Sequence, residues 1–94
     1  MFTAHANVIM PTPARYMVRL CNHFAHRVTV HREGDRARIE FPDAPCSLHA
    51  QAATLEMRIE AGDAAALQRL KGVVAEHLKQ VAAKEAFEIN WTDS

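Results

Sequence analysis

The amino-terminal residues alternate between apolar and polar side chains, which is the pattern of a strand with one buried face. Pro11 ends this pattern, and Thr12 followed by Pro13 predicts the start of a helix. A threonine side chain can accept a hydrogen bond from the first free amides of a helix, and proline at the first helical position has no amide to leave unpaired. We expect a strand over residues 2–10 whose inward side chains are Phe2, Ala4, Ala6, Val8 and Met10.

Two longer segments carry apolar residues at helical spacing. The first predicts a helix from Pro13 to about His26, with a buried stripe at Pro13, Met17, Leu20, Cys21 and Phe24. The second begins after Gly62-Asp63 and keeps one apolar face over about five turns, at Leu67, Leu70, Val74, Leu78 and Val81. The second segment is also rich in alanine and other good helix formers.

Between the two predicted helices, from Val28 to Ile59, the sequence consists of short alternating runs separated by turn residues. This pattern predicts a meander of four antiparallel strands. The inward positions are Val28 and Val30, then Ala37, Ile39 and Phe41, then Cys46, Leu48 and Ala50, and finally Leu55, Met57 and Ile59. After the second helix, alternation at Phe87, Ile89 and Trp91 predicts a last strand.

The predicted order is therefore strand, helix, four strands, helix, strand, which is an α+β fold. At 94 residues the chain can form one hydrophobic core, so we expect residues 1–94 to be a single domain. A two-layer sandwich follows, in which both helices cover one face of a mostly antiparallel sheet of about six strands. The other face should be polar and of mixed charge. Alternation fixes faces but not neighbours, so the strand order stays open.

Composition restricts the classes of partner. Eleven basic residues balance eleven acidic ones, so no overall positive field attracts phosphate backbones or anionic lipid. The aromatic side chains of the predicted sheet point inward, which is unlike a sheet on which nucleic-acid bases stack. No apolar run reaches the roughly 20 residues that cross a bilayer, and no secretion signal is recognised at the start. We expect a cytoplasmic protein with reduced cysteines and without a nucleic-acid or membrane partner.

One short segment concentrates chemically active side chains. Cys21, His23 and His26 lie within six residues, at the end of the first predicted helix. His23 lies at one edge of that helix's apolar stripe, and His77 lies at the edge of the stripe of the second helix. If the helices lie side by side, the two imidazoles face each other across the groove, and Cys46 can approach from the sheet below.

Imidazole and thiolate are ligands for zinc and iron, so His23, Cys46 and His77 form a candidate metal site with three protein ligands. No spacing here matches a known metal motif such as paired cysteines. The alternative is structural: His23 would be half-buried and bonded to the backbone, His26 would complement the helix dipole, and Cys21 and Cys46 would be small core residues. Both interpretations stay open on the sequence alone.

Catalysis is not indicated by the sequence. Cys21 is predicted in the middle of a helix on its buried side, where a thiol is normally inert, and no acidic residue stands ready to orient a histidine beside it. We therefore expect a non-catalytic binding or accessory protein. A sheet face or edge that pairs with a second copy is an ordinary surface for such a domain, so homodimerisation is a further expectation.

The chain resembles a bacterial family known as domain of unknown function 2218. The resemblance rests on Tyr16, Leu20, the run Cys21-Asn22-His23-Phe24-Ala25-His26-Arg27, the corner Ile39-Glu40-Phe41-Pro42 leading to Cys46, the pair His77-Leu78, and the terminal Ile89-Asn90-Trp91-Thr92. Two departures are Pro45, where the family pattern has a glycine, and Val81-Ala82-Ala83, which replaces a phenylalanine-rich stretch.

The resemblance implies a small α+β fold similar to the carboxyl-terminal domain of phosphohexomutases and to TATA-binding-protein-like folds. Relatives in this family are attached to siderophore-interacting proteins, which implies an accessory role linked to iron and a siderophore-interacting protein as partner. It also favours His23, His26, Cys46 and His77 over His5, His31 and His49 as site residues.

Overall fold

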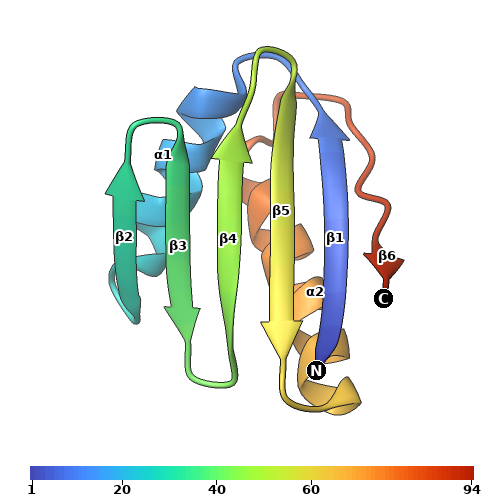
Figure 1. The fold of residues 1–94 in the computed structure, drawn as a ribbon. Coiled ribbons are helices and arrows are strands. Elements are labelled where there is room, and N and C mark those ends of the chain that lie inside the picture. The colour runs from blue at the N-terminus through green and yellow to red at the C-terminus, as the bar shows by residue number, and fades with distance from the viewer.

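The computed structural model describes residues 1–94 and contains six strands and two helices (Figure 1). Their order is β1 (Phe2–Ile9), α1 (Pro13–Phe24), β2 (Thr29–Glu33), β3 (Arg36–Phe41), β4 (Ala44–Ala50), β5 (Thr54–Ala61), α2 (Ala64–Val81) and β6 (Thr92–Asp93). The predicted α+β class and element order are confirmed.

All six strands belong to one sheet with the order β2-β3-β4-β5-β1-β6, and every neighbouring pair is antiparallel. The first strand therefore lies between β5 and the last strand, a position that the alternation of side chains could not reveal. Figure 1 shows both helices behind the sheet, so the other face is left open. The predicted two-layer arrangement, with both helices on one side, is confirmed.

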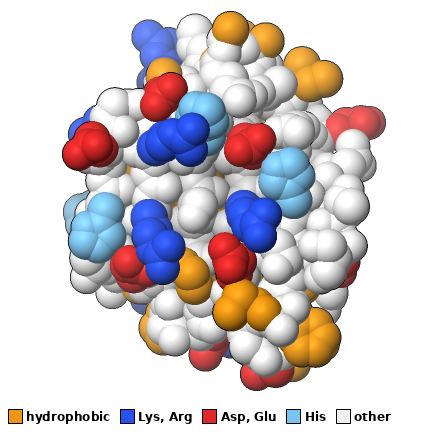
Figure 2. Space-filling view, viewed as in Figure 1, with side chains coloured by type: hydrophobic (Ala, Val, Ile, Leu, Met, Phe, Trp, Pro, Cys, Tyr) orange, Lys and Arg blue, Asp and Glu red, His pale blue; other side chains and the backbone are white.

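The core lies between the sheet and the helices and contains 25 buried apolar residues, whereas no polar or charged side chain is buried. Cross-strand partners on the inner face follow the predicted alternation, for example Ala4 opposite Ile59 and Ile39 opposite Cys46. Phe2 departs from it, because at the end of β1 its side chain is 45% exposed. The open face carries mixed charges, with basic, acidic and histidine side chains interspersed (Figure 2).

The helix starts differ in how well the sequence predicted them. Asp63 caps α2 as expected, since its carboxylate accepts a hydrogen bond of 2.7 Å from the Ala66 amide. Thr12 does not cap α1 with its side chain. It adopts a left-handed conformation with φ of 46°, and its backbone carbonyl, not its hydroxyl, accepts from the Arg15 and Tyr16 amides. The side-chain cap predicted at Thr12 was wrong because the chain turns too sharply there after Pro11.

The predicted last strand is also much shorter in the structure. Phe87, Ile89 and Trp91 are each half-buried against the core, but only Thr92–Asp93 pairs with β1, opposite His5 and Ala4. Before that point the chain runs along the sheet edge without a ladder of hydrogen bonds (Figure 1). One-sided burial alone produces period-two alternation, so the pattern could not separate an extended segment from a paired strand.

A tyrosine links this carboxyl-terminal segment to the first helix. The buried Tyr16 hydroxyl donates a hydrogen bond of 2.5 Å to the Glu85 carboxylate, and the Arg19 guanidinium lies 5.5 Å from the centre of the tyrosine ring. The contact joins residues that are 69 positions apart. It therefore holds the chain after α2 against α1.

We predict that this contact makes stability depend on alkaline pH. The hydrogen bond to Glu85, followed by burial, raises the pKa of Tyr16 above its ordinary value. An unfolded tyrosine releases its proton near about pH 10, whereas the folded one keeps it. The folded state therefore binds more protons, and stability falls as pH rises through about 10.

The variant Tyr16→Phe removes this linkage. Urea unfolding at about pH 9 and about pH 11 should show a smaller loss of stability for the variant than for the natural protein. Tyr16 is the only tyrosine of the chain, so absorbance of the phenolate reports its titration directly. Parallel losses in both proteins, or a phenol that titrates near about pH 10 in the folded state as it does in an unfolded chain, would contradict the prediction.

Candidate functional site

A pocket of about 570 Å³ opens where the end of α1 meets α2, β3 and the chain that leads into β2. Its size falls within the range of about 300 to 1,000 Å³ that is usual for small-molecule sites. The residues that line it are His23, Phe24, His26, Arg27, Val28, Phe41, Val73 and His77. The side chains thus come from both helices, from the last residue of β3, and from the connection that follows α1.

The rings in this pocket form a contiguous cluster. The centroids of His23 and His77 are 4.7 Å apart with an interplanar angle of 47°, so the structure brings together the two imidazoles that lie on opposite helices. Phe24 lies 4.9 Å from His77 and also 4.9 Å from Phe41, and it meets Phe41 edge to face. These separations are those of favourable aromatic contacts.

His77 is held in one tautomer by its own helix. Its Nδ1 lies 2.6 Å from the carbonyl oxygen of Val73, one turn earlier in α2. Because a carbonyl can only accept, Nδ1 carries the proton and donates it. In the neutral ring Nε2 is then unprotonated, and it is the nitrogen left for a ligand. The structural alternative described a half-buried His23 with a backbone bond, but in the structure His23 is exposed and His77 makes such a bond.

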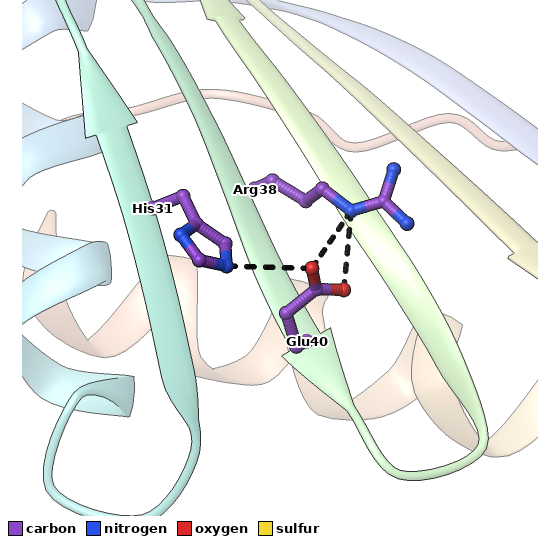
Figure 3. A network of polar contacts seen from close by, with 3 residues as sticks. All are labelled: His31, Arg38 and Glu40. Carbon is purple, nitrogen blue, oxygen red and sulfur yellow. Dashed lines mark hydrogen bonds and ion pairs between the residues drawn. The ribbon is translucent and has the colours of Figure 1, made fainter.

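The six histidines fall into two groups of three. The histidines of the open sheet face each have a carboxylate within 3.6 Å, in the pairs His5 with Glu56, His31 with Glu40, and His49 with Asp35. Figure 3 shows one of these pairs, in which the Glu40 carboxylate also accepts from Arg38 Nε at 3.0 Å. The histidines that line the pocket have no such partner.

The pocket therefore gathers one guanidinium and three imidazoles without a carboxylate. His23, His26 and His77 form no ion pair in the structure, and neither does the exposed Arg27 beside them. No aspartate or glutamate lines the pocket. Arg27 is thus the one permanently charged side chain of the lining, and no carboxylate among the lining residues offsets it.

The thiols of Cys21 and Cys46 lie outside the pocket. Cys46 on β4 is completely buried, and burial, followed by the neighbouring Cys21, raises its pKa to about 12. Burial also raises the pKa of Cys21, on the inner side of α1, while Arg32 acts in the opposite direction. Both cysteines are free thiols in the core and neither lines the pocket.

Of the three predicted metal ligands, only His23 and His77 come together. The inward face predicted for Cys46 is correct, but its position is too deep, because the core closes over it below the helices. No group of three or more histidine, cysteine, aspartate or glutamate side chains is arranged so that it could hold a metal ion. His26 does line the pocket, whereas Cys21 does not.

Comparison with known families finds a match over residues 5–92 to a family described as an uncharacterised protein conserved in bacteria, domain of unknown function 2218. The chain belongs to this family. A solved relative is the protein PA4090 of Pseudomonas aeruginosa, whose NMR structure is 35% identical in sequence with a TM-score of 0.82. The likeness covers 98% of this chain and 96% of that one. None of the curated proteins matches the chain.

All pocket residues fall inside the part of the chain that the family covers. Neither the family description nor the name of the P. aeruginosa protein states a ligand or a reaction. Neither helix is both long and apolar enough to span a bilayer.

Sequence reasoning missed several residues of this pocket. Phe41 was assigned only to the core, although it closes one side of the pocket, and Arg27 was not considered as a site residue. A signal for Arg27 was present, because it directly follows His26 at the end of the helix, where the chain leaves the core. Nothing in the sequence placed Phe41 beside Phe24, since the strand order was open.

The buried thiols lead to a prediction about reactivity. With a pKa of about 12, Cys46 should be almost entirely protonated at neutral and mildly alkaline pH, and the thiolate is the reactive form. In the folded variant Cys21→Ala, which keeps only Cys46, alkylation by iodoacetamide should be at least about 100-fold slower than for free cysteine.

Unfolding in urea should restore the ordinary rate, which provides the internal control. The companion variant Cys46→Ala keeps only Cys21. Burial also raises the pKa of the Cys21 thiol, so this variant should react slowly as well. Alkylation of Cys46 in the folded state at the rate of the unfolded chain would show that the thiol is accessible and would contradict its placement in the core.

Proposed function

We propose that this protein is a non-catalytic binding module and that the pocket between α1 and α2 holds a small anionic ligand with an apolar part. One observation carries the proposal: His23, His26, Arg27 and His77 converge on a hollow that contains no carboxylate. A guanidinium beside imidazole groups, with no carboxylate among them, is an arrangement that an anionic ligand completes through charge-assisted hydrogen bonds.

The apolar part of the ligand follows from the remaining lining. Half of the lining residues are apolar, and they lie beside Arg27 and the histidines: Phe24, Val28, Phe41 and Val73. Small-molecule sites commonly combine such apolar walls with a few polar groups that fix orientation. A simple inorganic anion would leave this apolar surface unused, so the proposed ligand is amphipathic.

Binding without turnover is supported by the composition of the site. An imidazole that acts as a general base is usually oriented by a carboxylate, and a covalent mechanism needs a nucleophile beside it. In this pocket no carboxylate orients a histidine. His77 is oriented by a backbone carbonyl instead. Both thiols are outside the pocket.

The cellular role that we propose is an accessory one in the cytoplasm, linked to iron and siderophore metabolism. Its support is the family resemblance, in which relatives are attached to siderophore-interacting proteins. Many iron chelators are anionic molecules with apolar parts, so the chemistry of the pocket agrees with this role. A siderophore-interacting protein is accordingly one proposed partner. A second copy is the other, and the outer edge of β2 is unpaired and available to it.

An alternative function is binding of zinc or iron through His23, Cys46 and His77. The free Nε2 of His77 and the neighbouring His23 ring favour two imidazole ligands. The structure keeps Cys46 in the core, away from these rings, so a water or a chelating molecule would have to supply the third ligand. The alternative therefore concerns a two-histidine site that receives a metal together with other donors.

The anion proposal is tested with hexanoate and hexanol as probes, observed through backbone amide signals by NMR. We expect hexanoate to shift the amides around residues 23–28, 41 and 73–77, and hexanol to bind at least about tenfold more weakly, because it lacks the charge. The variant Arg27→Gln should weaken hexanoate binding by about tenfold.

Arg15→Gln is the matched control, because Arg15 is an unpaired, exposed arginine at the other end of α1. It should leave hexanoate binding unchanged. Equal binding of hexanoate and hexanol, or equal weakening by both arginine variants, would reject an anion site in this pocket.

The metal alternative is tested by adding zinc to protein without a histidine tag. If two imidazoles bind zinc, the nitrogen signal of His77 Nε2 should shift on addition, His23→Ala should abolish the shift, and His23→Ala and His77→Ala should each abolish zinc uptake. His5→Ala removes a histidine from the open sheet face and should have no effect. Zinc uptake that survives His77→Ala, or no uptake by the natural protein, would rule out this site.

A further inference from the structure

Five of the eight residues that line the pocket carry rings. His23, Phe24, Phe41 and His77 lie in one contiguous cluster with neighbouring centroids 4.7 to 5.4 Å apart. The contacts within it are tilted or edge to face, which leaves ring faces and edges directed at several angles around one hollow. A flat ring can add to such a cluster through the same contacts and gains more than its buried area alone provides. The apolar part of the ligand is therefore better matched by an aromatic ring than by a flexible chain.

The polar part of the pocket, which consists of Arg27 and the histidines, favours a carboxylate over a phosphate group. His23, His26 and Arg27 lie at and just beyond the carboxyl-terminal end of α1, where backbone carbonyls carry partial negative charge. No helix amino terminus lines the pocket, so it lacks the converging amides that bind phosphate groups. A single guanidinium fork with adjacent imidazoles matches one planar, singly charged carboxylate.

His77 adds a third requirement. With its proton fixed on Nδ1 by the Val73 carbonyl, the neutral ring offers Nε2 as a hydrogen-bond acceptor. Of the polar side chains that line the pocket, histidine alone can accept a hydrogen bond, and His77 is the histidine whose accepting nitrogen is defined. A bound ligand that lacks a hydrogen-bond donor would shield His77 Nε2 from water and leave it unpaired, which is unfavourable.

From these three features we infer that the pocket is specific for an aromatic carboxylate that carries a hydroxyl group. The ring packs in the cluster of Phe24, Phe41 and the two imidazoles, the carboxylate binds Arg27 and its neighbouring histidines, and the hydroxyl donates to His77 Nε2. This inference rests on the proposed anion-binding function and names the ligand class for the same site.

The test compares affinities for four probes by NMR titration of the natural protein. Benzoate should bind about three- to tenfold more tightly than cyclohexanecarboxylate, because only benzoate can make the ring contacts. At least one of 2-hydroxybenzoate and 3-hydroxybenzoate should bind a further three- to tenfold more tightly, and methylation of that hydroxyl should remove the gain, since the methyl ether cannot donate.

The variant His77→Phe keeps a ring in the cluster and removes the acceptor. It should lose the preference for the hydroxyl, so that the hydroxybenzoate that the natural protein prefers binds no more tightly than benzoate. His31→Phe makes the same substitution on the open sheet face and should keep the preference. The methyl-ether comparison needs no variant, so the hydroxyl contact stays testable even if His77→Phe does not fold.

The outcomes separate the two levels of the proposal. If hexanoate binds but benzoate does not exceed cyclohexanecarboxylate, or if the methyl ethers bind as well as the phenols, the inferred ligand class is wrong while the anion site stands. Tighter binding of phenyl phosphate than of benzoate would also overturn the choice of carboxylate. If no carboxylate binds at all, the proposed function fails together with this inference.

Discussion

Two amphipathic helices cover the same face of the sheet because each has one apolar stripe and the sheet has one apolar face. Side chains at the border of each apolar stripe lie between the core and the solvent. His23 and His77 occupy such edges on the two helices, and packing of the helices beside each other brings their rings to 4.7 Å. The same packing buries Leu20 and Leu78 completely. The pocket is thus a direct consequence of how the core is covered.

The distribution of charge adds a second level of organisation. A neutral chain with equal numbers of acids and bases could pair its charges everywhere, and on the open sheet face it largely does, through pairs such as His31 with Glu40. Such exposed pairs contribute little to stability, because solvent screens them. They occupy the carboxylates of Asp35, Glu40, Glu56 and Glu60, and none of the other acidic side chains lines the pocket. On the other side of the molecule, at the end of α1, Arg27, His23 and His26 have no carboxylate partner.

The sequence supported predictions that depend on periodicity and failed where neighbours or depth decide. Stripe edges were enough to place His23 opposite His77, because a helix repeats with a fixed period and both helices had to face the sheet. Cys46 was assigned to the correct face, but alternation says nothing about how far a side chain lies beneath the surface. The last strand was predicted too long because half-burial of Phe87 and Trp91 imitates pairing. Phe41 was missed as a pocket residue because its contact with Phe24 depends on the placement of β3 beneath the end of α1.

The departure of this chain from its family after α2 bears on which end of the molecule holds the aromatic wall. The resemblance places a phenylalanine-rich stretch where this chain has Val81-Ala82-Ala83, and an aromatic pocket built from that stretch would be lost here. In the structure the aromatic wall comes instead from Phe24 on α1 and Phe41 on β3, which meet edge to face at 4.9 Å. Ala82 is buried, and the segment beyond it is fastened by the contact between Glu85 and Tyr16. Residues 81–83 do not line the pocket, so the ring cluster around His77 is built without them.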